Sequence, residues 1–327
     1  MKISVIIPSY NASRTIRQCL KAATSQAYSD YEVIVVDDAS TDETAQLAEK
    51  FPVRLIRQSY NQGAAAARNR GAKEGKGELF VFTDSDCVPP RDWLQKITGY
   101  FKDPQAVSVS GMYQTENKNS PQARFIGYDI DFRLRQEPDD AAIFGTYNCA
   151  IRREIFSELG GFDEHFPGIT LEDTDFGFRL GYRYPGRMLL AKDSFVGHYH
   201  REKLFLYLGR QFLLSRGRVW LLGTEERSET YASKDSLIQL PIPIVMILFL
   251  LAARRIPVEL VLGIEAGLAA LFLGCNWRFL NSIPSQESFR FRFYALGMQW
   301  LRNIVFATGV WMGFMDRIRG RSSVYTH

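Results

Sequence analysis

The chain has 327 residues, 46% of them hydrophobic, and a formal net charge of +4. This charge is too small to indicate a nucleic-acid-binding surface, and the length predicts a globular domain with an appended segment. The four cysteines are scattered without Cys-x-x-Cys spacing, which favours buried, reduced thiols over a zinc site or a disulfide framework. No signal peptide is expected, because Met1-Lys2 leads directly into a strand pattern.

Strands and helices alternate from residue 1 to about residue 110, which is the pattern of a parallel α/β sheet flanked by helices. Pro8 should end the first strand. The first helix should be capped by Asn11 or Ser13, and the second by a capping box of Ser40 and Glu43. Apolar patterns predict strands at residues 3–7, 32–36, 53–57, 79–83 and 106–110, and helices that begin near residues 16, 40, 64 and 90.

Two aspartates follow the most apolar of these strands. Residues 79–83 are apolar on both faces, as expected of a buried strand, and Asp84-Ser85-Asp86 comes directly after them. Carboxylates at such a strand end project into the crevice where open α/β sheets bind ligands. Two carboxylates that point the same way repel each other without a cation between them, and Mg²⁺ and Mn²⁺ prefer oxygen ligands. The pattern indicates a metal site that holds phosphate oxygens, with a solvated loop or a helix N-cap as the alternative.

A second acidic pair, Asp37-Asp38, ends the strand predicted at residues 32–36. A carboxylate there can accept hydrogen bonds from ribose hydroxyls or a base N–H, and the alternative is that the pair caps the next helix. Neither a Gly-x-x-x-x-Gly-Lys loop nor a Gly-x-Gly-x-x-Gly turn follows the first strand, which disfavours P-loop and dinucleotide sites. Two acidic pairs at strand ends on one edge of the sheet therefore favour a site in which a metal binds the diphosphate of a nucleotide.

The turn Asn61-Gln62-Gly63 precedes an alanine-rich helix. Small residues allow this helix to pack closely against the sheet or a ligand, and Arg68 within it could reach a phosphate. A packing role alone explains the alanines equally well.

The pair Glu172-Asp173 lies just before another predicted helix. One of these carboxylates could act as a general base that takes the proton from an attacking hydroxyl. The alternative is a favourable interaction of acidic side chains with a helix N-terminus, and the residues alone favour this alternative.

Two of the four histidines, His198 and His200, follow a short apolar strand. Their spacing places both on one face of an extended chain, so either could be a further metal ligand. A surface histidine pair without a function is the alternative.

The composition becomes apolar after about residue 235. Residues 237–253, 256–274 and 295–314 are three hydrophobic stretches, each shorter than the roughly 20 residues that cross a bilayer or interrupted by polar residues. Arg254-Arg255, together with Arg317, Arg319 and Arg321, resemble interfacial anchors. We expect membrane association through helices that span or re-enter, with a buried helical layer of a soluble domain as the alternative.

Taken together, these motifs resemble the family 2 glycosyltransferases, whose fold is the GT-A nucleotide-diphospho-sugar fold. The match covers about residues 1–200 and keeps the order of the family's motifs. The matching runs are Val5-Ile6-Ile7-Pro8-Ser9-Tyr10-Asn11, Val36-Asp37-Asp38-Ala39-Ser40-Thr41-Asp42, Asn61-x-Gly63, Ala67-Arg68-Asn69-x-Gly71, Asp84-Ser85-Asp86, Gly145-Thr146-Tyr147-Asn148, Gly160-Gly161-Phe162-Asp163 and Glu172-Asp173.

The resemblance implies a GT-A-type, mostly parallel sheet flanked by helices, plus C-terminal hydrophobic helices. It implies a glycosyltransferase domain at residues 1–235, with a nucleotide-binding half at 1–110 and an acceptor half at 111–235. Residues 236–327 would form a hydrophobic, membrane-associated helical segment.

The resemblance also implies roles for individual residues. Asp173 would be the catalytic base, and Asp86 and His198 would bind a divalent metal, Mn²⁺ or Mg²⁺. The nucleotide-sugar donor would be bound by Pro8, Tyr10, Asp37, Asp38, Arg68 and Asp84, and the acceptor by Glu172, Gly145, Thr146, Tyr147 and Asn148.

The family's processive synthases carry Gln-x-x-Arg-Trp, but here Gln211 is followed by Phe212-Leu213-Leu214, so addition of a single sugar is expected. The implied function is an inverting, metal-dependent transfer from a nucleotide-diphospho-sugar, commonly a UDP-sugar, to a hydroxyl of a lipid-linked or cell-envelope glycan. The enzyme would lie at the cell membrane with its catalytic domain facing the cytoplasm. A nucleotidyltransferase and a nucleotide-sugar-binding protein without catalysis are the alternatives.

Overall fold

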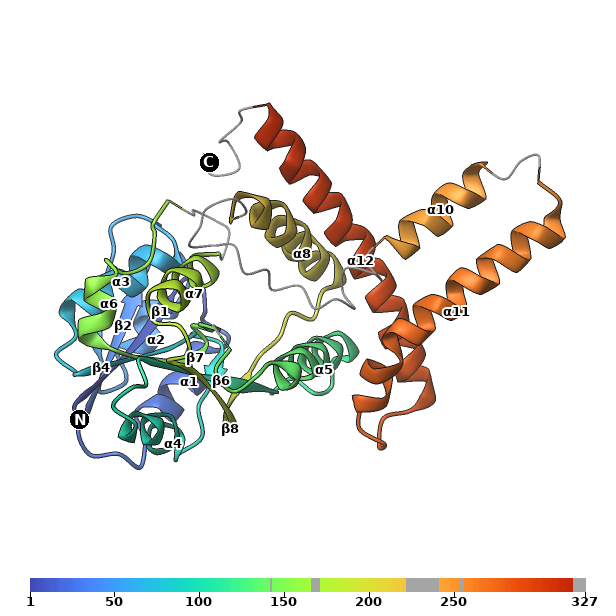
Figure 1. Cartoon of the computed structure of the whole chain (residues 1–327). Helices are drawn as coiled ribbons and strands as arrows, with labels where there is room; N and C mark the ends of the chain where they lie inside the picture. Colours follow the sequence, from blue (N-terminus) through green and yellow to red (C-terminus); the bar gives the residue numbers. More distant parts are fainter. Residues whose placement is uncertain (142, 166–170, 222–240, 253–255, 320–327) are drawn as a thin grey trace.

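The computed structural model describes residues 1–141, 143–165, 171–221, 241–252 and 256–319. It consists of a sheet with helices on both faces, and of long C-terminal helices that extend away from the sheet (Figure 1). The N-terminal strands and helices are therefore arranged as the alternating sequence pattern predicts.

One mixed sheet of eight strands organises the first 200 residues, in the order β3-β2-β1-β4-β7-β6-β8-β5. Strands β1 to β4 are mutually parallel, β7 is antiparallel to β4 and β6, β8 is parallel to β6, and β5 is antiparallel to β8. The strands are β1 (Ile3–Ser9), β2 (Tyr31–Asp37), β3 (Arg54–Arg57), β4 (Leu79–Thr83), β5 (Cys87–Val88), β6 (Ser108–Thr115), β7 (Asn148–Arg152) and β8 (Met188–His198).

Helices cover both faces of this sheet, and further helices form the C-terminal part of the chain. They are α1 (Ile16–Ala23), α2 (Thr44–Ala48), α3 (Ala64–Glu74), α4 (Trp93–Gly99), α5 (Pro121–Gln136), α6 (Arg153–Glu158), α7 (Glu172–Arg183), α8 (Leu204–Arg218), α10 (Ile242–Ala252), α11 (Val258–Ser282) and α12 (Phe289–Ile318), with short 3-10 turns η1 (Tyr100–Lys102) and η2 (Val219–Leu221).

The alternation of side chains along β1 explains the two hydrophobic cores. Ile3, Val5 and Ile7 point to the face that α1 and α4 cover, whereas Ile6 points to the face covered by α3, α6 and α7. The alanine-rich α3 lies so close to the sheet that a Cβ on Gly71 would be 2.5 Å from Cγ2 of Ile6. The small residues of α3 therefore serve packing against the sheet.

Three local predictions are wrong. Pro8 does not end β1, because the strand continues to Ser9, which pairs with Asp37. Neither Asn11 nor Ser13 caps α1, since Thr15 precedes that helix without a side-chain hydrogen bond. The Ser40–Glu43 capping box does not form either, and α2 begins after Glu43 with no side-chain cap.

The side chains predicted as caps connect two loops instead. The Asn11 amide donates to Oγ of Ser40 at 3.0 Å, and Oδ1 of Asn11 accepts from the amide of Thr41 at 2.8 Å. Asn11 has a φ of +49°, a left-handed conformation that asparagine tolerates better than most residues. These bonds hold the loops after β1 and β2 together at one edge of the sheet.

The C-terminal helices share a hydrophobic core with α5 and α8. Phe125 of α5 and Tyr207 of α8 pack in one cluster with Phe279 of α11 and Phe291 of α12. By length and composition alone, α11 could cross a membrane, and α10 is apolar but shorter. Residues 237–240 and 253, at the ends of the first predicted hydrophobic stretch, and the predicted domain boundary near 235 lie outside the described residues.

Candidate active site

The carboxyl ends of β1, β2 and β4 meet at one edge of the sheet because these strands are parallel neighbours. Asp37 is the last residue of β2, and Asp84 directly follows β4. The sequence prediction that the two acidic pairs lie on one edge is consistent with this register. A phosphate-bearing ligand and the metal predicted to bind it would therefore lie at this edge of the sheet.

A buried guanidinium connects this edge to α7. Nη2 of Arg68 lies 2.7 Å from Oδ1 of Asp84, and Nη1 lies 2.6 Å from Oε1 of Glu172. Arg68 and Glu172 are almost fully buried, whereas Asp84 is half-buried. Because both Nη atoms are bound to carboxylates, the partners of Arg68 differ from the phosphate predicted from the sequence.

Asp173 lies next to this ion pair at the start of α7 and is half-buried. Burial, reinforced by the carboxylate of Glu172, raises the pKa of Asp173 to about 7, although Arg68 acts in the opposite direction. Its Oδ1 accepts a hydrogen bond from the amide of Thr174 at 2.6 Å. A carboxylate whose pKa lies near neutrality is suited to accept and release a proton.

The two aspartates after β2 have different partners. Oδ1 of Asp38 accepts from the amide of Gln62, and Oδ2 accepts from the amide of Gly63, both at 2.8 Å. Asp38 thus fixes the turn that leads into α3. Oδ1 of Asp37 is buried and has no hydrogen-bond partner among the described residues. A buried carboxylate oxygen without a partner is costly, so Asp37 is the better candidate for binding a ligand.

The two residues predicted to line the nucleotide pocket from β1 differ in exposure. Pro8 is buried within the strand, whereas Tyr10, which follows it, is 49% exposed. An exposed aromatic ring beside the acidic strand ends can pack against a planar base.

Asp86, Cys87 and His198 come together where β5 pairs with the end of β8. Oδ1 of Asp86 lies 3.4 Å from Nε2 of His198. Burial raises the pKa of Asp86 and His198 opposes this shift. The pKa of the Cys87 thiol is raised well above its usual range by burial and by Asp86. Its soft sulfur suits Mn²⁺ or Mg²⁺ less well than carboxylate oxygens do. Asp86 and His198, the two predicted metal ligands, therefore lie close together, and their binding of a metal stays a prediction.

His200 does not join this pair of ligands. It is 5% exposed, its ring lies 4.5 Å from that of His198, and Tyr113 packs edge-on against both rings. Burial, together with His198, lowers the pKa of His200, so this imidazole is neutral and its ring packs beside that of His198.

The predicted acceptor segment Gly145-Thr146-Tyr147-Asn148 lies beside the end of β4. Tyr147 stacks on Tyr113 with ring centroids 3.5 Å apart, and a Cβ on Gly145 would lie 2.3 Å from the Tyr147 ring. Thr146 is 3% exposed. The fully buried Asn148 donates to the carbonyls of Met112 and Ser194 and accepts from the indole N–H of Trp93. Contact of these four residues with an acceptor stays a prediction.

Asn69 has a structural role that was not predicted from the sequence. Its carboxamide accepts from the amide of Phe162 at 2.9 Å and donates to the carbonyl of Phe162 at 2.8 Å. Gly161 lies beside it with a φ of +75°, and a Cβ there would come within 2.6 Å of Oδ1 of Asn69. The motif around Arg68 and the Gly-Gly-Phe-Asp motif therefore pack against each other, a contact that no pattern in the sequence indicates.

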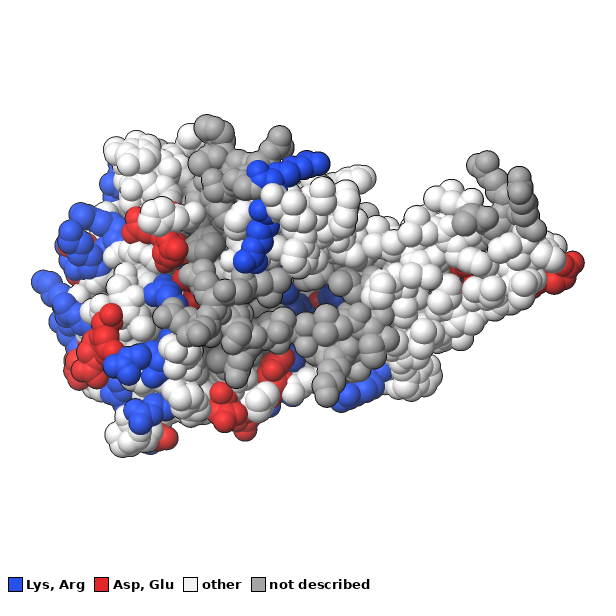
Figure 2. Space-filling model, turned by 45° about the horizontal axis from the view of Figure 1, so that its top comes forward, with Lys and Arg blue, Asp and Glu red and all other residues white. Residues whose placement is uncertain are grey.

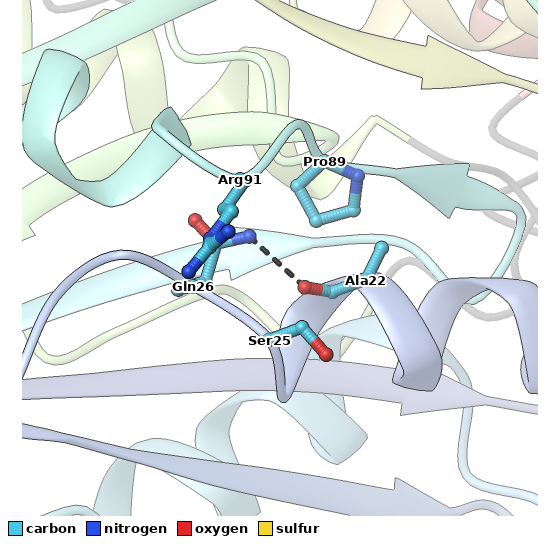
Figure 3. Close-up of a pocket in the computed structure, with 5 residues that line it drawn as sticks. All are labelled: Ala22, Ser25, Gln26, Pro89 and Arg91. Atoms are coloured by element: carbon cyan, nitrogen blue, oxygen red, sulfur yellow. Dashed lines mark hydrogen bonds between the residues drawn. The ribbon is translucent and has the colours of Figure 1, made fainter.

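A pocket of about 410 Å³ lies at the end of α1, lined by Ala22, Ser25, Gln26, Pro89 and Arg91 (Figure 3). Nε2 of Gln26 donates to the carbonyl of Ala22 at 3.0 Å and to that of Pro90 at 2.9 Å. Its polar side chain therefore serves the local fold, and none of the predicted site residues lines this pocket.

The mixed sheet flanked by helices, with acidic residues at the ends of its parallel strands, defines an α/β protein with a candidate ligand site at this edge. The sequence model of "Glycosyl transferase family 2" matches residues 4–160. An uncharacterized glycosyltransferase of Haemophilus influenzae is 34% identical over 181 residues, which make up 53% of this chain and 69% of that protein. The chain belongs to glycosyltransferase family 2.

Other similar proteins agree with this assignment. Glycosyltransferase AglE of Haloferax volcanii is 29% identical over 238 residues, covering 67% of this chain and 74% of that protein. The Escherichia coli UDP-Glc:alpha-D-GlcNAc-diphosphoundecaprenol beta-1,3-glucosyltransferase WfgD is 32% identical over 127 residues, covering 38% of this chain and 50% of that protein. The mannosyltransferase PcManGT from Pyrobaculum calidifontis, solved in complex with GDP-Man and Mn²⁺, shares the fold with a TM-score of 0.64 at 19% identity, covering 95% of this chain and 87% of that one.

Proposed function

We propose that this family 2 glycosyltransferase moves one sugar, with inversion, from a nucleotide-diphospho-sugar to a hydroxyl of a lipid-linked or cell-envelope glycan. The observation that carries the proposal is the pair of bonds made by Arg68. They hold Glu172, and with it Asp173, beside the strand end that bears Asp84. Asp173, the proposed proton acceptor, would thus lie next to the sheet edge that we propose binds the donor.

The donor nucleotide would bind where the loops after β1 and β2 are tied together. Asp37 offers a buried oxygen without a partner to a ribose hydroxyl or a base N–H, and Tyr10 offers an exposed ring. Asp38 would support the site indirectly, because it fixes the turn at Gln62 and Gly63 that leads into α3, the helix that carries Arg68. Pro8, buried in β1 beside Val36 of β2, would support this pocket, and Asp84 would face the ribose. The choice of UDP over GDP or dTDP rests on the usual donors of the family.

The residues present fit a divalent metal. The carboxylate of Asp86 and the imidazole of His198 provide two ligand atoms, and the half-exposed Asp86 leaves room for phosphate oxygens to complete the shell. The imidazole favours Mn²⁺ over Mg²⁺, which prefers oxygen ligands alone. When bound, the cation would neutralise negative charge on the departing diphosphate. The Mn²⁺ in the complex of the mannosyltransferase PcManGT supports this proposal.

Asp173 would act as the general base. Its carboxylate takes the proton of the acceptor hydroxyl while that oxygen attacks the anomeric carbon from the face opposite the leaving group. The new carbon–oxygen bond forms as the bond to the nucleoside diphosphate breaks, so the configuration inverts. Glu172, held by Arg68, positions Asp173 and raises its pKa.

The acceptor would reach the site from a membrane. The helices α10 and α11 are apolar, and the similar glucosyltransferase WfgD acts on a diphosphoundecaprenol-linked sugar. We therefore propose a lipid-linked acceptor, with the C-terminal segment 236–327 at the cell membrane and the catalytic domain on its cytoplasmic side. The buried segment Gly145–Asn148 and Glu172 would shape the acceptor side of the site from within the fold.

A donor panel tests the proposal. The full chain is incubated with UDP-, GDP- and dTDP-sugars in Mn²⁺, Mg²⁺ or chelator, and a polyprenyl-diphosphate-linked sugar serves as acceptor. Metal-dependent release of a nucleoside diphosphate, accelerated by acceptor and lost in Asp173→Asn, is expected. If pyrophosphate is added, formation of a nucleoside triphosphate and a sugar 1-phosphate from the donor would favour a nucleotidyltransferase. Metal-dependent donor binding without transfer to any acceptor would favour a protein that binds nucleotide-sugars without catalysis.

A further inference from the structure

The long helix α12 has one face fixed to the rest of the chain. Oδ1 of Asp129 on α5 lies 2.6 Å from Nη1 of Arg302, and Asp316 pairs at 2.6 Å with Arg216 of α8. A Cβ on Gly313 would lie 2.4 Å from the carbonyl oxygen of Arg216. This close packing and these ion pairs, whose carboxylates are buried, fix the rotation of α12 about its own axis. One of its faces must therefore point away from the body.

That outer face is apolar and aromatic. Phe293 is 60% exposed and Trp311 is 64% exposed. They are 18 residues apart, which is five turns of an α-helix, so they point in the same direction. The same stripe holds three further exposed apolar residues, which are Phe289, Phe314 and Ile318. A stripe of this length exposed to water on a fixed helix needs a partner.

The charges around this stripe have one sign. From residue 289 to residue 319, each exposed charged side chain is an arginine, namely Arg290, Arg317 and Arg319. The single acidic residue of this range, Asp316, is 6% exposed and paired with Arg216. Exposed aromatic residues bordered by arginines are complementary to a lipid surface with anionic headgroups.

The neighbouring helices continue the apolar surface. α11 and α12 diverge from a common end, and the hairpin of α10 and α11 projects from the body (Figure 1). Figure 2 shows this projection almost free of blue and red, in contrast to the sheet domain. Only 6% of the apolar window of α11 is buried within the chain. A lipid bilayer can cover all of these surfaces together, whereas a second protein copy would have to match each of them.

We infer that the outer face of α12 lies in the interface of an anionic membrane, parallel to its surface, and does not cross it. The sequence suggested that residues 295–314 span or re-enter, but a spanning α12 would pull Arg302, Asp316 and their partners into hydrocarbon. Lying flat, α12 immerses Phe293, Trp311 and Ile318 while its inner face stays on the enzyme. This inference rests on the proposed membrane attachment and assigns it a second, interfacial element.

A fluorescent probe on the full chain tests the inference. An environment-sensitive dye is attached at Trp311→Cys or Ile318→Cys, and at Tyr60→Cys as a control on the sheet domain, where Tyr60 is 65% exposed. A Cys275→Ser background is used, because the other three cysteines are buried. Each labelled protein is added to phosphatidylcholine vesicles with or without phosphatidylglycerol, carrying bromine quenchers near the headgroups or near the bilayer centre.

An interfacial helix lies about 5–10 Å into the headgroup boundary, so we expect the shallow bromines to quench the α12 labels roughly twofold or more and the deep bromines far less. Phosphatidylglycerol should strengthen the effect, and Arg290→Gln with Arg319→Gln should remove that dependence. Strongest quenching by the deep bromines would overturn the inference in favour of a span. Unquenched labels together with disulfide-linked dimers of Trp311→Cys would show that α12 meets a second copy.

Membrane contact of α12 and transferase activity are measured independently, so one can be refuted while the other stands. Labels quenched as expected in a protein that releases no nucleotide from any donor would refute the transferase proposal and leave α12 at the membrane. Nucleotide release by a protein whose α12 labels stay in water would refute membrane contact of α12 and leave the transferase proposal intact.

Discussion

Arg68 of α3 and Glu172 of α7 are joined by an ion pair of 2.6 Å across 104 positions of sequence. Both side chains are almost fully buried, and the same guanidinium holds Asp84. Burying charges is costly unless each is paired. The contact therefore links the sheet edge that we propose binds the donor to the helix that carries the proposed base.

Arg68→Met should lower the free energy of unfolding by roughly 3–5 kcal/mol, because it leaves Glu172 buried without a counter-charge. Arg70→Met is the matched control, since Arg70 lies on the same helix, is half exposed and pairs with Glu74; its loss should cost less than about 1 kcal/mol. Urea unfolding measures both. Adding Glu172→Gln to Arg68→Met should recover part of the lost free energy of unfolding. A double variant no more stable than Arg68→Met alone would show that the unpaired charge of Glu172 is not the cause of the loss.

The activity should depend on pH through Asp173. Its pKa is raised to about 7 by burial and by Glu172, and only the deprotonated form can accept a proton. We expect kcat/KM to rise with pH and to level off above about 7, falling roughly tenfold for each pH unit below it. A profile already flat from pH 5 to 8 would show that another group is the base.

Asp173→Asn should lower the transfer rate by roughly 10²–10⁴ while leaving nucleotide affinity nearly unchanged. Asp163→Asn is a suitable control, because Asp163 is also half-buried but lies in the preceding loop, where it accepts from the amide of His165. Single-turnover transfer and calorimetric titration with UDP or GDP separate the two effects. Full transfer by Asp173→Asn would contradict the assignment.

Much of the fold could be predicted because it depends on local patterns. The strand at residues 79–83 is apolar on both faces, and the alternation along β1 divides its side chains between two cores. The caps could not be predicted, since Asn11 and Ser40 bond to each other across two loops rather than to their own helices. Contacts between segments far apart in sequence decide such positions.

The same reason limits what could be predicted about the site. Parallel strand ends indicated that Asp37 and Asp84 share an edge, because strand direction alone implies it. The difference between Asp37 and Asp38 depends on the amides of Gln62 and Gly63, which only the folded turn brings near. Arg68 and Asn69 also have partners in α7 and in the loop before it, namely Glu172 and Phe162, and no spacing in the sequence encodes these contacts.

Asp37 and Asp38 should respond differently to substitution. Asp38→Asn removes the charge that anchors two amides and should lower the melting temperature, whereas Asp37→Asn should barely change it. Because a hydrogen bond to a charged group contributes about 1.5–3 kcal/mol, Asp37→Asn should weaken nucleotide binding roughly ten- to a hundredfold. Thermal unfolding and titration with UDP or GDP measure the two effects. Equal loss of binding and equal destabilisation in both variants would refute the division of roles.

Metal dependence should follow Asp86 and His198 and not Cys87, although all three offer ligand atoms within 4.8 Å of one another. The soft sulfur of Cys87 is poorly matched to Mn²⁺, so Cys87→Ser should retain Mn²⁺-dependent nucleotide binding. Asp86→Asn and His198→Gln should each weaken it by about tenfold or more, and chelator should reduce the wild-type protein to the same level. His165→Gln is the control for a histidine change, since His165 has a 97% exposed side chain. Titration of nucleotide with and without Mn²⁺ measures each case, and a Mn²⁺ effect that survives in Asp86→Asn would place the cation elsewhere.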